Sequence, residues 1–236
     1  MLFYSMVFLL VSCSGSDTEK KASTDSTAVD STTAVVAPKI TTITTPENML
    51  VVTHKVSNYA KWKTSYDEHD SARLANGIHN YVIGRGFNDS NMVLVAVKVD
   101  DTTKAKAFAK DPGLKKAMQK GGVMGAPAFA LTTMVFQDTV TLSSDLRSRT
   151  TFMVKDWAAW QKAFEEGKQE RLDNGITVRA YGHISDNDKK VVLVTAITDT
   201  AKAFAYYKSD MLKKRRAESG VIGEPVRFLY RVVQRY

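Results

Sequence analysis

The chain has 236 residues, of which 44% are hydrophobic and 25% charged, as is ordinary for a globular protein of one large domain or two domains of about 100 residues. Its single cysteine excludes an intramolecular disulfide, and its four histidines show no metal-ligand spacing, so we expect neither a metal site nor a bound cofactor. The net charge of +8 favours anionic partners, but the basic runs lack interleaved aromatic residues, so we expect no nucleic-acid binding.

The amino terminus has the features of an export signal. Residues 1–11, MLFYSMVFLLV, form an apolar run that is too short to span a bilayer stably. The run ends in Leu10-Val11-Ser12-Cys13, which resembles the signal of bacterial lipoproteins, although no Lys or Arg precedes it. The resemblance implies that residues 1–13 are a signal with a lipobox and that Cys13 is lipidated. We therefore expect a lipid-anchored protein of the bacterial cell envelope, at the outer membrane or the periplasmic face. The alternatives are an ordinary cleaved signal or a disordered end with an incidental cysteine.

Residues 14–48 have the composition of a flexible segment. Ser, Thr, Ala and Asp dominate, and there is no aromatic residue. Such a segment buries too little apolar surface to offset the entropy lost on ordering. We predict a disordered tether between the anchor and the folded part.

An internal repeat fills the rest of the chain. The segment Trp62–Ile78, WKTSYDEHDSARLANGI, recurs 98 residues later as Trp160–Ile176, WQKAFEEGKQERLDNGI. The same offset continues towards the carboxyl end without a gap, which indicates two copies of one module. We assign repeat 1 to residues 49–137, a linker to 138–148 and repeat 2 to 149–236.

Each copy is predicted to contain six elements in the order strand, helix, strand, strand, helix, strand. The evidence is helical spacing of apolar residues in two segments and β-rich runs in the others. Repeat 1 is predicted at 49–56, 59–75, 78–85, 92–99, 102–120 and 128–136, with a glycine loop at 121–127, and repeat 2 at 149–154, 156–173, 176–184, 190–197, 199–217 and 225–235.

This order is that of the ferredoxin-like βαββαβ module, which gives an α+β fold. One module has helices on only one face of its sheet, so the other face needs a partner. We predict that the two repeats pair into one intramolecular eight-stranded barrel with four helices outside, which also removes exposed sheet edges. The chain would then be a pseudo-dimer and a monomer.

The residues of each repeat also resemble a known superfamily. The pattern V..Y..W...(F/Y)..H...R...G, followed by an apolar strand and D...A..F, L and GV.G.P, is similar to the dimeric α/β-barrel proteins of the antibiotic-biosynthesis-monooxygenase type. Here the pattern consists of Val56, Tyr59, Trp62, Tyr66, His69, Arg73, Gly77, Asp101, Ala105, Phe108, Leu114, Gly122, Val123, Gly125 and Pro127. The resemblance implies this fold. It does not select an activity, because the superfamily includes monooxygenases, isomerases, haem-degrading enzymes and stress proteins.

The candidate catalytic residues are His69 and Arg73. His69 follows the apolar side of the first helix, and an imidazole suits general acid–base work near neutral pH. Arg73 and its counterpart Arg171 could each anchor an anionic substrate. The structural alternatives are a partly buried histidine with satisfied hydrogen bonds, and ion pairs of the two arginines with Glu68 and Glu166.

The other candidates are pocket walls. Trp62 and Tyr66 lie one helical turn apart and either line a pocket or pack the helix onto the sheet. His54 and His79 lie in predicted strands and could point into the barrel.

Two functions follow from these observations. In the first, the barrel interior binds a small organic molecule, and the resemblance implies a cofactor-independent monooxygenase or a related enzyme. In the second, the barrel core is filled, and the protein is a non-catalytic stress or interaction module whose basic outer face binds an acidic partner.

Overall fold

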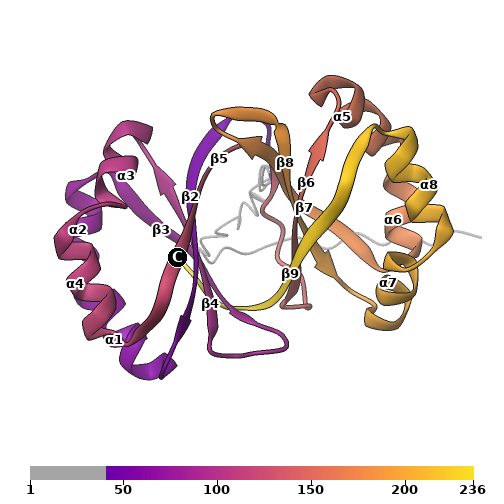
Figure 1. The fold of residues 1–236 in the computed structure, drawn as a ribbon. Helices are drawn as coiled ribbons and strands as arrows, with labels where there is room; N and C mark the ends of the chain where they lie inside the picture. Colours follow the sequence, from indigo (N-terminus) through magenta and orange to yellow (C-terminus); the bar gives the residue numbers. More distant parts are fainter. Residues whose placement is uncertain (1–40) are drawn as a thin grey trace, which may run out of the picture. The chain divides into compact units, whose positions relative to one another are not determined.

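The protein is described by a computed structural model covering residues 41–236 (Figure 1). The predicted signal, Cys13 and residues 14–40 of the predicted tether lie outside the described residues. The elements in chain order are β1 Thr42–Ile43, β2 Glu47–Val56, α1 Tyr59–Glu68, α2 Asp70–Ala75, β3 Ile78–Gly86, β4 Met92–Val99, α3 Thr102–Phe108, α4 Pro112–Lys120, β5 Val123–Asp138, β6 Leu146–Val154, α5 Trp157–Glu166, α6 Lys168–Asp173, β7 Ile176–Ile184, β8 Asn187–Ile197, α7 Thr200–Tyr207, α8 Asp210–Glu218 and β9 Val221–Arg235.

The strands close into a ring. Repeat 1 contributes them in the order β5-β2-β4-β3, and repeat 2 contributes β9-β6-β8-β7. Antiparallel pairing of β3 with β9 and of β5 with β7 joins the two sheets at two seams. Helices α1–α4 lie on the outer face of the first repeat's strands and α5–α8 on that of the second (Figure 1). The predicted α+β barrel of two ferredoxin-like repeats is confirmed.

Each of the four predicted helices is in fact two short helices. In the first, the break falls at His69, whose backbone N–H bonds to the Tyr66 carbonyl at 3.3 Å and not to the residue four positions back. Gly167 takes the same conformation at the matching place in repeat 2. In the second predicted helix, Asp111 accepts a hydrogen bond from the Leu114 N–H, and Pro112 starts a new helix. At this second break the local cap overrides the helical periodicity, whereas His69 and Gly167 make no side-chain cap.

Several strand boundaries also differ from the prediction. Strand β1 and the start of β2 fall inside the segment predicted to be a tether, because Thr42 and Ile43 pair with the end of β5. Strand β5 begins at Val123, within the predicted glycine loop. Gly125, with φ of +68°, lies in a bulge of that strand between the register positions of Met124 and Ala128.

A glycine lies at each seam of the ring. A Cβ atom on Gly84 would collide with the ring of Tyr230 across the β3–β9 seam. One on Gly182 would collide with the Thr133 backbone across the β5–β7 seam. These two glycines match each other in the repeat, so both copies provide the close approach that closure needs.

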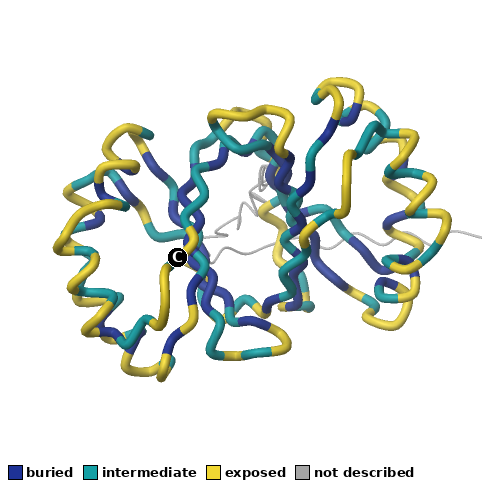
Figure 2. The backbone as a smooth tube through the Cα atoms, in the orientation of Figure 1, coloured by how far each residue is buried: buried dark blue, intermediate teal, exposed yellow. Residues whose placement is uncertain are grey.

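The core has two kinds of compartment. The larger apolar clusters lie between the helices and the outer face of the strands, around Trp62 in repeat 1 and Trp160 in repeat 2. A smaller cluster of Val51, Leu94 and Tyr230 lies inside the ring. Buried segments therefore run along strands that are covered on both faces (Figure 2). Among the helices of residues 41–236, none is long and apolar enough to cross a membrane.

Candidate functional site

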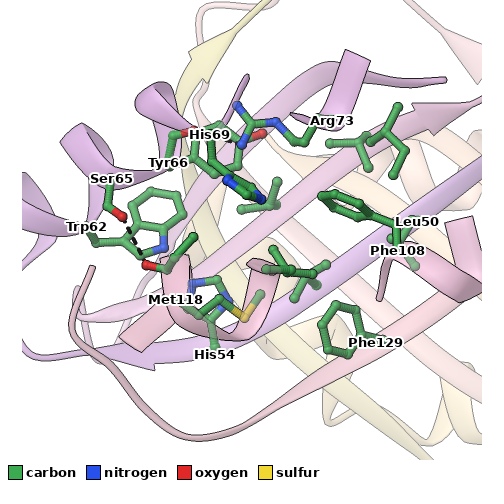
Figure 3. Close-up of a pocket in the computed structure, with 16 residues that line it drawn as sticks. Leu50, His54, Trp62, Ser65, Tyr66, His69, Arg73, Phe108, Met118 and Phe129 are labelled. Atoms are coloured by element: carbon green, nitrogen blue, oxygen red, sulfur yellow. Dashed lines mark hydrogen bonds between the residues drawn. The ribbon is translucent and has the colours of Figure 1, made fainter. Parts of the chain in front are cut away.

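The first pocket lies between helix and sheet in repeat 1, not in the lumen of the barrel. Its lining comes from β2, β4 and β5 on one side and from α1, α2, α4 and the end of α3 on the other (Figure 3). Apolar side chains such as Leu50, Val95, Phe108 and Phe129 make up most of the wall. The cavity has a volume of about 60 Å³, which is room for several water molecules, since one water needs roughly 10–15 Å³.

His54 of β2 lines this pocket from the sheet. Only 4% of its surface is exposed, and its ring lies 5.5 Å from that of Trp62. Neither ring nitrogen has a hydrogen-bond partner within residues 41–236. Burial lowers the pKa of His54 from 6.5 to about 4, so the imidazole is neutral at pH 7. A neutral imidazole carries one donor and one acceptor, and here both are unpaired in an apolar cavity.

His69 lines the pocket from the helix side, at the break between α1 and α2 (Figure 3). Its ring stacks on Phe108, with centroids 5.9 Å apart. The buried Nε2 atom finds no partner in the described part of the chain. Burial and, second, the nearby Arg73 lower the pKa of His69, while Asp111 opposes the shift. His69 is therefore also neutral at pH 7, as a general base must be.

The hydrogen bonds of the Arg73 guanidinium go to groups of the protein itself. It is 4% exposed and donates from Nη1 to the Tyr66 carbonyl at 2.7 Å, from Nε to Asn80 Oδ1 at 3.1 Å and from Nη2 to Asp70 Oδ1 at 3.0 Å. Its ion-pair partner is thus Asp70. The expected partner Glu68 instead pairs with Lys120 at 2.6 Å. These bonds place Arg73 in a structural network at the edge of the pocket.

Trp62 and Tyr66 have both of the predicted roles, because they pack the helix onto the sheet and also line the pocket. Trp62 is buried against the sheet, and its ring stacks on that of Tyr66 with centroids 5.1 Å apart. Both also line the pocket. The Tyr66 hydroxyl donates to Asn80 Oδ1 at 2.5 Å, and burial raises the pKa of this phenol, so it remains protonated.

His79 does not belong to this pocket. Its side chain is 47% exposed and pairs with Asp100, with Nε2 2.9 Å from Oδ2. On an antiparallel strand the side-chain direction alternates, and at His79 it leads to solvent, not into the barrel. No group of three potential metal ligands occurs in residues 41–236.

Arg171 lies in a second pocket, at the matching place in repeat 2. Its Nη1 donates to the Phe164 carbonyl, and its guanidinium lies over the Phe164 ring at 3.7 Å. The expected ion pair with Glu166 does not form within the described chain. His69 and Arg171, both candidates from the sequence, therefore lie in two different pockets. The second cavity has a volume of about 100 Å³.

The two pockets differ at most positions that can carry chemistry. Second-pocket residues that replace His54, His69, Met118 and Phe129, by the 98-residue offset, are Phe152, Gly167, Arg216 and Arg227. Neither Arg216 nor Arg227 is among the candidate residues predicted from the sequence. The repeat alignment contained the signal, because an aromatic position in one copy is an arginine in the other.

The lumen has its own cationic lining, which the sequence analysis also missed. Arg147 and Arg149 of β6 and Arg179 of β7 line it. Arg147 donates to the carbonyls of Ser144 and Leu146, and Arg179 pairs with Asp138 at 2.8 Å. The lumen arginines that make these bonds therefore hold the loop between β5 and β6.

Comparison with known proteins gives the fold but no closer relationship. No protein-family model matches the sequence, and no curated protein matches it. Among solved structures, a Fusobacterium nucleatum protein provisionally described as a monooxygenase is 12% identical with a TM-score of 0.53, covering 80% of this chain and 93% of its own. An anthrone oxidase-like protein is 14% identical with a TM-score of 0.52, covering 80% and 92%. A protein provisionally described as a chlorite dismutase is 16% identical with a TM-score of 0.51, covering 80% and 95%. These similarities show that the chain has the dimeric α/β-barrel fold. At such identities they show no activity.

Proposed function

We propose that this chain is a lipid-anchored protein of the bacterial envelope whose first pocket binds a small, mostly apolar organic molecule and oxidises it with O₂ without a cofactor. The envelope assignment is supported by the lipobox-like Leu10-Val11-Ser12-Cys13. The binding assignment is supported by the cavity beside His54 and His69.

One observation carries the binding proposal. Three imidazole nitrogens, Nδ1 and Nε2 of His54 and Nε2 of His69, are buried without a partner among the described residues. A buried polar atom without a hydrogen bond costs about 1–3 kcal/mol, so folded proteins rarely retain one without a use. A ligand with a hydroxyl or carbonyl group would satisfy these atoms, and its apolar body would contact Phe108 and Phe129.

The chemistry follows from the neutral state of both histidines. A neutral imidazole can take a proton from an acidic C–H or O–H group of a bound molecule. The resulting anion is electron-rich and can react directly with O₂. For a methylene group the net change is CH₂ and O₂ to C=O and H₂O, so one oxygen atom enters the substrate and the other leaves as water. Of the two imidazoles, His69 is the better base, because it is only partly buried whereas His54 is 4% exposed, so the protonated form of His69 costs less free energy in the pocket.

Anthrone is a suitable probe, because its central methylene is acidic and its oxidation product, anthraquinone, is easily quantified. We expect the purified protein to consume one O₂ per anthraquinone formed. Replacing the base in His69→Ala should lower turnover by roughly 100-fold or more while leaving the protein folded. The matched control is His79→Ala, which removes an exposed histidine outside the pocket and should leave turnover unchanged.

Native mass spectrometry of the protein purified from host extract separates binding from catalysis. A reproducible adduct of small mass that is lost in His54→Phe would support the pocket as a ligand site. An adduct without any O₂ consumption would identify a binding protein, not an oxidase. Unchanged turnover and unchanged adducts in both histidine variants would contradict the proposal.

A further inference from the structure

The second pocket is built like the first but carries charge. It lies between α5–α8 and the outer face of the second repeat's strands. Its apolar part includes Phe152, Trp160 and Leu193. Two arginines, Arg216 of α8 and Arg227 of β9, stand where the first pocket has Met118 and Phe129. The two pockets therefore have the same arrangement of helices and strands, but they differ at these two side chains, which would contact a ligand.

The guanidinium of Arg227 is stacked on an aromatic ring but is not paired with a carboxylate of the described residues. Its guanidinium lies over the Tyr207 ring at 3.5 Å from the centroid, which fixes its orientation. Its Nε is buried without a hydrogen-bond partner in the described chain, and so is the hydroxyl of Tyr207. No ion pair of Arg227 exists within residues 41–236. Stacking thus leaves the donor edge of the guanidinium available.

Arg216 lies in the same part of the pocket. It is half-buried and within electrostatic range of Arg227, and burial lowers the pKa of both groups. The carboxylate that acts on Arg216 from a distance is Glu224, but it forms no ion pair with Arg216 in the part of the chain that the structure describes. Two partly buried arginines therefore face one cavity. Their desolvation and mutual repulsion cost free energy unless a bound anion neutralises them.

Two other polar side chains of this pocket, Tyr206 and Arg215, are bound to one carboxylate. Glu170 accepts from the Tyr206 hydroxyl at 2.6 Å and from Arg215 Nε at 2.9 Å. Arg171 donates from Nη1 to a backbone carbonyl, while its Nε is buried without a partner in the described chain. Tyr206 and Arg215 are therefore already bound, whereas neither Arg216 nor Arg227 has an ion-pair partner among residues 41–236.

We propose that the second pocket binds a small organic acid, whose carboxylate is held by Arg216 and Arg227 with the Tyr207 hydroxyl as a further donor. The planar guanidinium of Arg227 matches the two oxygens of a carboxylate. The apolar body of the acid lies against Phe152, Trp160 and Leu193. This site is separate from the first pocket, and its assignment does not depend on the proposed oxidation.

The test uses two probes of equal size, naphthalene-2-carboxylate and naphthalene-2-carboxamide, titrated into the purified full chain by calorimetry at pH 7. We expect the carboxylate to bind at least about tenfold more tightly than the neutral amide, and added salt to reduce the difference. The variants Arg227→Phe and Arg216→Met place the residues of the first pocket in the second. Each should reduce the preference for the carboxylate to less than about threefold.

Two controls locate the effect. Arg231→Gln removes an arginine from the same strand that is exposed and paired with Asp145, and it should retain the preference. His54→Phe alters only the first pocket and should retain it as well. Equal affinity of the wild type for both probes, or a preference that persists in both Arg216→Met and Arg227→Phe, would overturn the proposal. If Arg227→Phe does not fold, Arg227→Lys replaces it, because lysine keeps the charge and loses the two-oxygen contact, and its preference should fall at least about threefold.

Discussion

Arg73 lies over the ring of Tyr66, with its guanidinium carbon 3.7 Å from the ring centroid, and donates a hydrogen bond to the carbonyl of the same residue. Repeat 2 contains the same arrangement between Arg171 and Phe164, also at 3.7 Å. In both copies the arginine joins the short second helix to the first across the helix break. This shared contact explains why both copies have arginine here, although their pockets differ.

Replacing Arg73 should therefore affect stability more than ligand binding. Arg73→Met keeps the volume but leaves Asp70 and Asn80 without their partner. Because Arg73 is 4% exposed and donates three hydrogen bonds, although Asp70 is 41% exposed, we expect the free energy of unfolding to fall by about 2–3 kcal/mol, from the lost hydrogen bonds. Urea unfolding measures this. The exposed Arg231→Gln should change stability by less than about 1 kcal/mol. Equal small effects in both variants would contradict the structural role of Arg73.

The pH dependence of stability should report the buried His54. Its pKa is about 4 in the folded protein and near 6.5 in the unfolded chain. The unfolded state therefore binds more protons between these values, and stability falls as the pH drops from about 6.5 towards 4. From pH 7 to pH 5 this group alone should remove about 2 kcal/mol.

The matched variant for this measurement is His54→Phe, which places the residue of repeat 2 at the same position. It should lack that part of the acid sensitivity in urea unfolding at pH 7 and pH 5. The same loss in the variant and the wild type would mean that His54 does not titrate in this window.

The seam glycines should be sensitive to a single methyl group. Gly84→Ala forces a Cβ atom into the ring of Tyr230, and we expect a loss of about 1–3 kcal/mol of unfolding free energy. Gly182→Ala should have a similar effect at the other seam. Gly113→Ala, in an exposed first turn of α4, brings its Cβ atom only against the flexible side chain of the N-cap Asp111, 2.7 Å from Oδ1, so the change in stability should stay within about 1 kcal/mol, that of a weakened helix cap. Thermal unfolding of the three variants is compared. Larger losses of stability at Gly84 and Gly182 than at Gly113 would show that the cost arises at the seams and not from an added methyl group in general.

Lipidation makes a separate prediction. In a bacterial host, the wild-type chain should fractionate with membranes and incorporate labelled palmitate. Cys13→Ala should do neither, because at least two acyl chains are needed for stable anchoring. Membrane association that persists in the unlabelled variant would point to a different mode of attachment.

The repeat predicted most of the fold, because two copies of the βαββαβ order leave one open sheet face each to be covered. The side-chain directions on the strands could not be predicted. In a barrel with helices outside, both strand faces are buried, so alternation does not distinguish the lumen from the helix side. The sequence therefore allows His54 to point into the barrel, whereas in the structure it lines the pocket between helices and sheet. The break at Pro112 depends on a local cap by Asp111 within a segment of helical periodicity, and the break at His69 has no side-chain cap that the sequence could signal.

Closure of the ring within one chain, by the β3–β9 and β5–β7 seams, has a genetic consequence. In a barrel made of two identical subunits, every substitution appears twice, so a change that suits one pocket is imposed on the other. Here each substitution appears once. One repeat can keep its residues while the other changes. A histidine at position 69 can therefore be absent from repeat 2, and an arginine at position 227 can be absent from repeat 1, without any effect on the other pocket.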